Sequence, residues 1–438
     1  MLSAFGRAFR TPDLRNKLLF TLLIVAVFRL GSHVPVPGVK YAAVQACINN
    51  AGTNTGFLGL VNLFSGGALL QLSIFALGIM PYITASIIIQ LLTVVIPRFE
   101  QLKKEGQAGQ TKMTQYTRYL TIGLAILQSS TLVTFAQNPQ NLFGGTCTNI
   151  LVDHSMVTIL LMVLTMTAGT GMIMWLGELI TDRGIGNGMS LLIFTSIVAR
   201  FPQQLWSIQQ QDGRWDKFLF VLLIGFLVIA AVVFVEQSQR RIPVQYAKRM
   251  IGRQMYGGTS TYIPLKVNMA GVIPVIFASS LLAMPTMVSQ FARKPNNVGN
   301  PAWVNWVDTY LVRGDHPLYM LFYTLLILFF TFFYVSITFN PTEVADDMKR
   351  YGGFIPGIRA GRPTASYLSY VLNRITVPGA IYLALVSLIP LVAIRLIGAT
   401  QNFPFGGTSI LIMVGVGLDT VKQIESQLQQ RHYEGFLR

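Results

Sequence analysis

Long apolar stretches separated by polar segments recur ten times along this chain. They lie at residues 18-34, 74-96, 117-136, 155-177, 189-201, 218-235, 268-288, 317-339, 375-394 and 406-421. A helix of roughly 20 apolar residues spans a bilayer, and only helices or closed barrels satisfy their backbone hydrogen bonds in lipid. These runs are too uniformly apolar for the alternating strands of a barrel. The pattern predicts an all-α polytopic membrane protein with ten transmembrane helices.

The composition supports this class and excludes others. Hydrophobic residues make up 52% of the 438 positions and charged residues only 11%, whereas a soluble protein carries about 25% charged residues. Two cysteines exclude a disulfide scaffold or a cysteine-based metal cluster. Both, Cys47 and Cys147, follow apolar runs on the same predicted side. We expect unpaired thiols, with a disulfide as the alternative, because the sequence does not say whether the two loops meet.

The distribution of positive charge predicts the orientation. The net charge is +16, and 24 of the 33 lysines and arginines fall on the side of the N-terminus, eight on the other, with Arg29 inside the first run. Basic loops stay in the cytoplasm, so we expect both termini there, in a bacterial plasma membrane. No cleavage site follows the first run, and we expect it to be retained as a span.

One apolar segment is too long for a single span. It runs from Phe57 to Ile96, about 40 residues, which is twice what a bilayer needs. The glycine pair in Ser65-Gly66-Gly67 is the expected break, because glycines favour no helix. Phe57 to Leu72 would then enter from the non-cytoplasmic side and stop part way, which is tolerated only against protein or water.

An internal repeat relates the second run to the seventh. Gly78-Ile-Met-Pro81-Tyr-Ile-Thr-Ala-Ser86 aligns with Gly271-Val-Ile-Pro274-Val-Ile-Phe-Ala-Ser279 at Gly, Pro, Ile, Ala and Ser. The fifth and tenth runs are both short and preceded by glycines. The second and seventh spans would cross in opposite directions, so the repeat would be inverted. We expect two five-helix halves, 1-215 and 216-438, with a pathway where they meet.

The runs lack the groups that other membrane activities need. No Asp or Glu lies in the middle of a run, and neither H-E-x-x-H, G-x-S-x-G nor a phosphate-binding loop occurs. We therefore expect a passive, non-enzymatic pathway without cofactor or metal, driven by a partner. A secondary solute transporter with inverted repeats is the alternative.

Several runs of residues resemble the SecY family of protein-conducting channels across essentially the whole chain. They are Ser65 to Ala68, Ile74 to Gln90, Arg183 to Gly188, Tyr246 to Arg249, Pro264 to Pro274, Phe339 to Pro341 and Pro356 to Arg359. The resemblance implies an hourglass pore between the two halves. It also implies the partners SecE, SecG, the SecA ATPase, the ribosome, SecDF, YidC, precursor polypeptides with signal sequences, and the lipid bilayer.

The resemblance also implies roles for individual residues. A pore ring is expected at Ile79, Ile83, Ile193, Ile276, Ser280 and Ile412. A plug is expected at about 57-72, including Phe57, Asn62, Phe64, Ser65, Gly66 and Gly67. A lateral gate is expected at Ser86, Gln90, Asn187 and Ser279. Docking of SecA and the ribosome is expected on the cytoplasmic loops 236-267 and 340-374, at Arg241, Lys248, Arg249, Arg253 and Arg359.

Each of these roles has an ordinary alternative. Isoleucines in membrane helices most often pack or face lipid, and intramembrane polar residues often form plain helix-packing bonds. The half-inserted segment would otherwise be a fixed re-entrant element. The positive-inside rule alone accounts for most basic loop residues.

Overall fold

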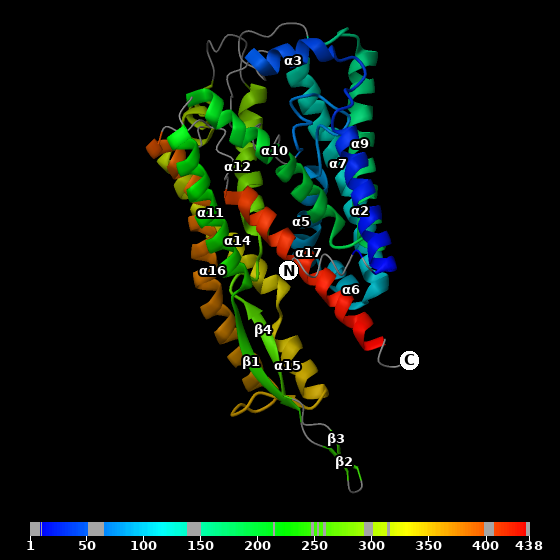
Figure 1. The fold of residues 1–438 in the computed structure, drawn as a ribbon, viewed down its shortest axis with the longest axis vertical. Coiled ribbons are helices and arrows are strands. Elements are labelled where there is room, and N and C mark those ends of the chain that lie inside the picture. Colours follow the sequence, from blue (N-terminus) through cyan, green and yellow to red (C-terminus); the bar gives the residue numbers. More distant parts are fainter. Residues whose placement is uncertain are drawn as a thin grey trace. The chain divides into compact units, whose positions relative to one another are not determined.

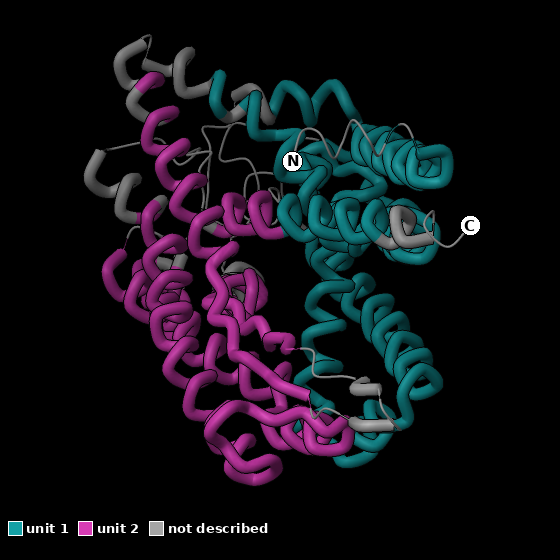
Figure 2. The backbone as a smooth tube through the Cα atoms, turned by 60° about the horizontal axis from the view of Figure 1, so that its bottom comes forward, with its two compact units in different colours: residues 1–215, 399–404, 416–438 teal, residues 216–398, 405–415 magenta. Residues whose placement is uncertain are grey.

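The computed structural model describes most of the chain and divides it into two compact units. The described residues are 9, 11-50, 65-137, 150-212, 215-246, 249-251, 254-256, 260-292, 301-312, 316-397 and 407-434. Unit 1 comprises 1-215, 399-404 and 416-438, and unit 2 comprises 216-398 and 405-415 (Figure 2). The end of the chain, 416-438, thus belongs to the same compact unit as the first 215 residues. The two predicted halves, 1-215 and 216-438, stay a prediction.

Unit 1 is built from helices (Figure 1). They are α2 (Pro12–Gly31), α3 (Tyr41–Asn50), α5 (Met80–Val95), α6 (Pro97–Lys104), α7 (Gln107–Gln137), α9 (Met156–Arg183) and α10 (Gly188–Asp212), joined by the second part of α17 (Gly407–Glu434). α9 packs against α2, α7 and α10, while α5 packs on α7. The fully buried Met162 and Met166 of α9 meet Leu132 and Val133 of α7 in the core.

Glycines let the backbones of unit 1 approach closely. A Cβ at Gly188 would lie 1.9 Å from the carbonyl oxygen of Gly177, so α9 touches the start of α10 without intervening side chains. A Cβ at Gly169 would lie 2.2 Å from the carbonyl oxygen of Ile74. Small residues at such crossings are typical of membrane helices, where close packing replaces the hydrophobic drive available in water.

Unit 2 contains the remaining long helices and two small sheets. Its helices are α11 (Trp215–Gln237), α12 (Ile273–Ala292), α13 (Ala302–Val307), the π-helix η2 (Asp308–Val312), α14 (Pro317–Thr338), α15 (Pro341–Arg350), α16 (Arg362–Ile397) and the start of α17. α14 packs between α12 and α16. Its strands are β1 (Gln239–Tyr246), β2 (Arg249–Ile251), β3 (Gln254–Tyr256), β4 (Ser260–Lys266) and β5 (Gly353–Phe354).

The two predicted cytoplasmic loops of unit 2 form one folded structure. β1 pairs antiparallel with β4 over seven residues, and β5 adds to its other edge, with Gln245 opposite Phe354. Beneath the sheet, Ile242 and Leu265 pack with Met348 of α15 and Leu368 of α16 in one apolar cluster. In the described residues, β1, β4, β5, α15 and the start of α16 therefore form a single folded unit, called the platform below.

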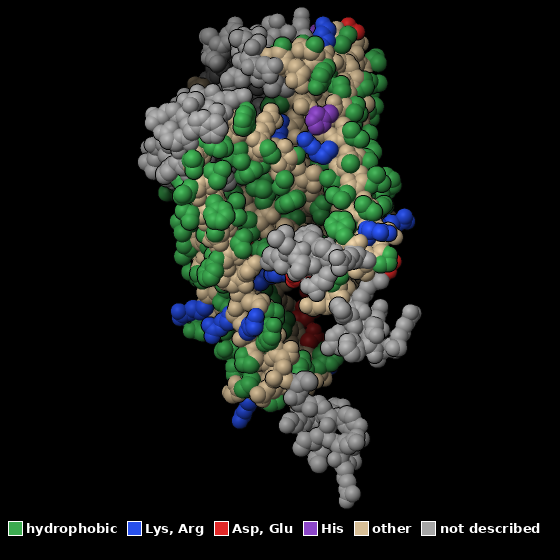
Figure 3. Space-filling model, in the orientation of Figure 1, with side chains coloured by type: hydrophobic (Ala, Val, Ile, Leu, Met, Phe, Trp, Pro, Cys, Tyr) green, Lys and Arg blue, Asp and Glu red, His purple; other side chains and the backbone are tan. Residues whose placement is uncertain are grey.

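Each of the ten predicted runs overlaps a helix in the described residues. Three helical stretches, Met156–Arg183, Pro317–Arg350 and Arg362–Ile389, are long and apolar enough to cross a membrane by themselves. A fourth is the pair α5 and α6, bent by 101°. Large apolar side chains such as Phe226 and Phe329 are exposed, and Figure 3 shows hydrophobic side chains covering the face of α11 and α14. A water-soluble protein rarely exposes so much apolar surface.

Two expectations need correction. The second predicted run starts at residue 74, but residues 74-79 form turns, because the left-handed Gly78 (φ +57°) delays the helix until Met80. The expectation of free thiols is wrong for Cys47, which is buried and disulfide-bonded. The only other cysteine of the chain, Cys147, lies outside the described residues.

Candidate functional site

The predicted pore residues of α5 lie at its first turn. Ile79 is the N-cap residue and is 2% exposed, and the amide of Ile83 donates to its carbonyl oxygen at 3.1 Å. The two side chains are thus one helical turn apart on one face. Ile193, near the start of α10, is also buried.

The other predicted pore residues belong to unit 2 and show the same spacing. Ile276 is buried in the first turns of α12, and the partly exposed Ser280 follows one turn later. Ile412 is 3% exposed in the segment of α17 assigned to unit 2. Each unit thus contributes branched apolar side chains close to helix N-termini, and whether they form one ring stays a prediction.

The repeated Gly-x-x-Pro segments adopt the same backbone in both units. Gly78 (φ +57°) and Gly271 (φ +61°) are both left-handed. In each case the helix begins two residues later, at Met80 or Ile273, and proline is its second residue. Proline suits a first helical turn because it needs no amide partner there, and glycine adopts positive φ without strain. The sequence repeat is therefore a structural repeat at the level of the local chain.

Two of the predicted gate residues, Ser279 and Asn187, form hydrogen bonds with nearby backbone groups of their own helix. Ser279 is buried and its hydroxyl donates to the carbonyl oxygen of Ile276 at 2.8 Å. Asn187 accepts from the amides of Met189 and Ser190 and so caps α10. Ser86 is half-buried and Gln90 is exposed. Their part in a gate stays a prediction.

Only the end of the predicted plug can be described. Phe57, Asn62 and Phe64 lie outside the described residues. From Ser65 onward the chain forms turns, with left-handed Gly66 and Gly67 (φ +64° and +97°), as the predicted break requires.

The segment after these glycines is firmly held in unit 1. Leu69 and Leu72 are buried in its core beside residues of α7 and α9. The amide of Val36 donates to the carbonyl oxygen of Leu72 at 3.0 Å, and the amide of Ile74 donates to that of Val34 at 2.9 Å. Ala68 to Leu72 is therefore anchored, and any movable part of the predicted plug must precede it.

The platform of unit 2 carries the predicted docking residues. Arg241 projects from β1 with its guanidinium 4.8 Å from the ring centre of Tyr262, on the neighbouring strand β4. Arg249 belongs to β2, while Lys248 and Arg253 lie outside the described residues. Figure 3 shows lysine and arginine side chains gathered around β1. A stacked guanidinium stays accessible to phosphate or carboxylate at little entropic cost.

Arg359 follows a tight turn on the same platform. In Ile355-Pro356-Gly357-Ile358, the amide of Ile358 donates to the carbonyl oxygen of Ile355 at 3.0 Å, and Gly357 is left-handed (φ +83°). Proline then glycine is the signature of a type II turn. The Thr364 hydroxyl donates to the Arg359 carbonyl oxygen at 2.8 Å, which fixes the backbone while the side chain stays exposed.

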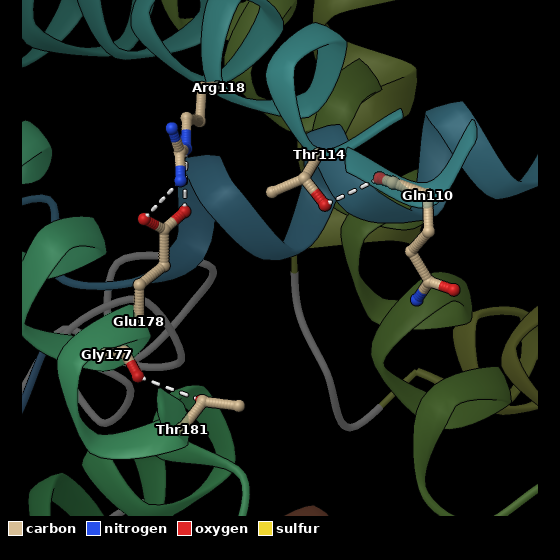
Figure 4. Close-up of polar contacts among 6 residues, drawn as sticks. All are labelled: Gln110, Thr114, Arg118, Gly177, Glu178 and Thr181. Atoms are coloured by element: carbon tan, nitrogen blue, oxygen red, sulfur yellow. Dashed lines mark hydrogen bonds and ion pairs between the residues drawn. The ribbon is translucent and has the colours of Figure 1, made fainter. Parts of the chain in front are cut away.

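An ion pair joins α7 and α9 that sequence analysis did not identify. Arg118 Nε and Nη2 donate to the two carboxylate oxygens of Glu178 at 2.8 and 2.7 Å (Figure 4). One turn further along α9, the Thr181 hydroxyl donates to Gly177 and accepts from the amide of Gly188, the first residue of α10. The sequence did contain a signal for this ion pair, because the predicted topology puts Arg118 and Glu178 at the ends of adjacent spans on the same, predicted cytoplasmic side.

We expect Arg118→Gln and Glu178→Gln each to lower the midpoint of thermal unfolding in detergent, because each leaves a charge without its bidentate partner. The coupling between a partly exposed pair of this kind is about 0.5–1 kcal/mol. The exchanged pair, Arg118→Glu with Glu178→Arg, should regain most of the loss. An exchanged pair no more stable than either single variant would show that the contact contributes nothing.

Comparisons with known proteins agree with this geometry. The family model SecY matches residues 73–421. The chain belongs to the SecY family. It is 67% identical to the protein translocase subunit SecY of Streptomyces galbus and 60% identical to that of Mycobacterium tuberculosis, in each case over 100% of both chains.

Solved structures share the fold at low sequence identity. A structure described as a protein conducting channel superposes with a TM-score of 0.64 over 94% of this chain and 91% of its own, at 19% identity. A SecY structure whose plug domain is described as stabilising the closed state gives a TM-score of 0.62 at 17% identity, with the same coverage. This SecY chain therefore has the channel fold, and the expectation drawn from its sequence runs is confirmed.

Proposed function

We propose that this SecY chain forms the pathway through which unfolded polypeptides cross the bacterial plasma membrane and membrane segments enter it laterally. Family membership and the channel fold support a protein-conducting channel over a solute transporter. The single observation that carries the mechanism is the pair of equivalent helix starts, one in each unit, that bear Ile79 and Ile83 or Ile276 and Ser280. The sequence contains no G-x-x-x-x-G-K-[ST] phosphate-binding loop, so in this proposal the driving force comes from a partner.

In this proposal the ten helices form two inverted halves around an hourglass pore, with both termini in the cytoplasm. The shared Gly-x-x-Pro backbone of α5 and α12 supports such an inverted repeat. Branched apolar side chains would fit around an extended polypeptide, while a dewetted constriction opposes ion flow.

The platform is the proposed docking surface for the SecA ATPase and the ribosome. Its strands hold Arg241, and its turn presents Arg359. Arginine binds RNA phosphates or acidic protein surfaces through guanidinium groups that are exposed and already held in position. SecE and SecG as companion subunits, and SecDF and YidC as auxiliaries, follow from the family alone.

The proposed plug is shorter than the sequence suggested. Because Ala68 to Leu72 is anchored in the core of unit 1, the hinge lies at Gly66 and Gly67, and the moving part precedes them. Displacement of that part would open the pathway on the non-cytoplasmic side.

We expect Ile83→Ser with Ile276→Ser to produce a measurable ion leak in planar bilayers, because hydroxyls hydrate a constriction that branched side chains keep dry. Ile89→Ser is a matched control, since Ile89 is buried in the same helix α5 two turns away. Conductance at baseline, even after deletion of residues 57-64, would mean that these isoleucines only pack. Solute uptake by vesicles that lack any motor or ribosome would favour the transporter instead.

A further inference from the structure

A buried amide lies three residues before the left-handed glycine that precedes α12. Asn268 is 4% exposed, and its Nδ2 donates to a carboxylate oxygen of Glu236 at 2.6 Å and to the carbonyl oxygen of Gly271 at 3.2 Å. Its Oδ1 is buried and has no hydrogen-bond partner in the described part of the chain. The two acceptors therefore fix the orientation of the amide, because the reversed amide would turn its oxygen toward a carboxylate.

The equivalent turn of unit 1 forms without such an amide. Gly78 aligns with Gly271, so Phe75 takes the position of Asn268. Phe75 is buried, and its ring stacks on that of Phe28 in α2 with the ring centres 5.9 Å apart. Both glycines nevertheless have positive φ and are followed two residues later by a helix. The turn itself does not need an amide, and a buried acceptor without a partner destabilises the fold. The bond from Asn268 to Glu236 therefore serves something other than the turn.

This bond closes the junction between the platform and two long helices of unit 2. Glu236 lies in the last turn of α11, just before β1, and Asn268 lies between β4 and α12. The amide of Val267 donates to the carbonyl oxygen of Ser238 at 3.0 Å, which extends the pairing of β1 with β4 up to the junction. A Cβ at Gly379 of α16 would collide with the carbonyl oxygen of Val267, so the backbone of a third helix packs directly against it. A displacement of β1 and β4 therefore reaches the start of α12 through the hydrogen bonds of Asn268.

We propose that Asn268 and Glu236 are positioning residues of the channel: their hydrogen bond transmits a displacement of the platform to α12, whose first turns carry Ile276 and Ser280. The inference rests on the proposed docking of SecA on the platform and on the proposed pore. It adds to them by assigning the step between docking and opening to one pair of side chains. Without this bond, SecA would still occupy the platform, but α12 would stay in place.

The test measures SecA-driven export into membrane vesicles at increasing SecA concentration, with the complete channel and its co-purified partners. Asn268→Leu removes both donations but keeps a buried apolar side chain, as Phe75 does in unit 1. We expect half-maximal export at the wild-type SecA concentration, while the maximal rate falls roughly tenfold, the effect of one lost hydrogen bond to a charged group. Glu236→Gln, whose amide oxygen still accepts from Asn268, should keep most of the rate. Thr376→Val is the matched control, because the buried Thr376 hydroxyl donates to the Leu372 carbonyl oxygen of its own helix α16; it should change neither quantity.

A reversed pair separates transmission from stability. In Asn268→Asp, two carboxylates face each other and both donations are lost. Combining this change with Glu236→Gln restores the bond between the two side chains with donor and acceptor exchanged. The donation to Gly271 stays lost, because a carboxylate has no hydrogen to donate. The reversed pair should therefore regain most of the maximal rate lost in Asn268→Asp, and a reversed pair as slow as that single variant would overturn the inference.

The other outcomes separate this inference from the proposed function. A wild-type maximal rate in Asn268→Leu would overturn the link and leave the channel function standing. A higher SecA concentration at half-maximal export, with an unchanged maximal rate, would show that the pair only shapes the docking surface, and it would also overturn the link. If Asn268→Leu does not reach the wild-type protein level, the comparison of Asn268→Asp with the reversed pair decides the question. If the wild-type channel itself shows no SecA-driven export, the proposed function is wrong and this inference with it.

Discussion

Arg359→Glu should reduce SecA-driven export into membrane vesicles at least about tenfold, because a reversed charge opposes the docking of an acidic or phosphate-rich partner. The effect should be confined to docking. Arg359 is exposed and its backbone is held by a type II turn and by the Thr364 hydroxyl, so the platform keeps its fold. Membrane insertion and the protein level of the variant should equal those of the wild type.

Arg350→Glu is the matched control for this prediction. Arg350 is also exposed and basic, but it ends α15 and does not follow the Pro-Gly turn. A generic loss of positive potential would affect both variants alike, whereas a specific contact affects Arg359 alone. Unchanged translocation in the Arg359 variant would remove this residue from the docking surface.

The positions of the helices along the chain could be predicted because they depend on hydropathy. The ten apolar runs overlap ten helices, and the glycine pair at 66 and 67 lies in turns with positive φ. The start of α5 was misplaced, since the left-handed Gly78 keeps residues 74-79 out of the helix although the other five are apolar. Hydropathy identifies which residues enter the membrane, but local dihedral angles decide where helices begin.

The sheet that joins the two predicted cytoplasmic loops could not be predicted from the sequence. β5 has only two residues, and its pairing with β1 connects positions more than a hundred residues apart. A strand of two residues is too short to show an alternation of apolar and polar positions or a recognisable turn at its ends. Consequently Arg241 and Arg359 were assigned to separate loops, although one apolar cluster supports both.

The roles of the polar residues were the least accessible. Asn187 was selected as an intramembrane amide, yet its side chain caps α10, which any helix start can require. Arg29 was set aside as a single charge in the first span, yet its guanidinium donates to the carbonyl oxygen of Gly66, which is distant in sequence.

The lateral gate is tested by restraining α5 against α12. Cysteines at Ser86 and Ser279, in a chain with Cys47 and Cys147 replaced, should crosslink in the idle channel if these two helices border the exit. A short bridge should then block secretory precursors and membrane-protein insertion alike, since an apolar signal sequence must leave sideways between the halves. Reduction should restore both activities.

A crosslink inside unit 1 controls for the chemistry of this experiment. The hydroxyls of Ser129 on α7 and Thr167 on α9 lie 3.3 Å apart, and these helices pack within the same unit. Cysteines there should crosslink as efficiently and leave export intact. A bridge between two helices that move together does not restrict any motion that export needs. Normal export through a channel fully bridged between positions 86 and 279 would place the exit elsewhere, even though the chain remains a SecY protein. Blocked export in the control as well would instead show that bridging rigid helices harms the channel by itself, and the gate would then need a pair of positions further along α5 and α12.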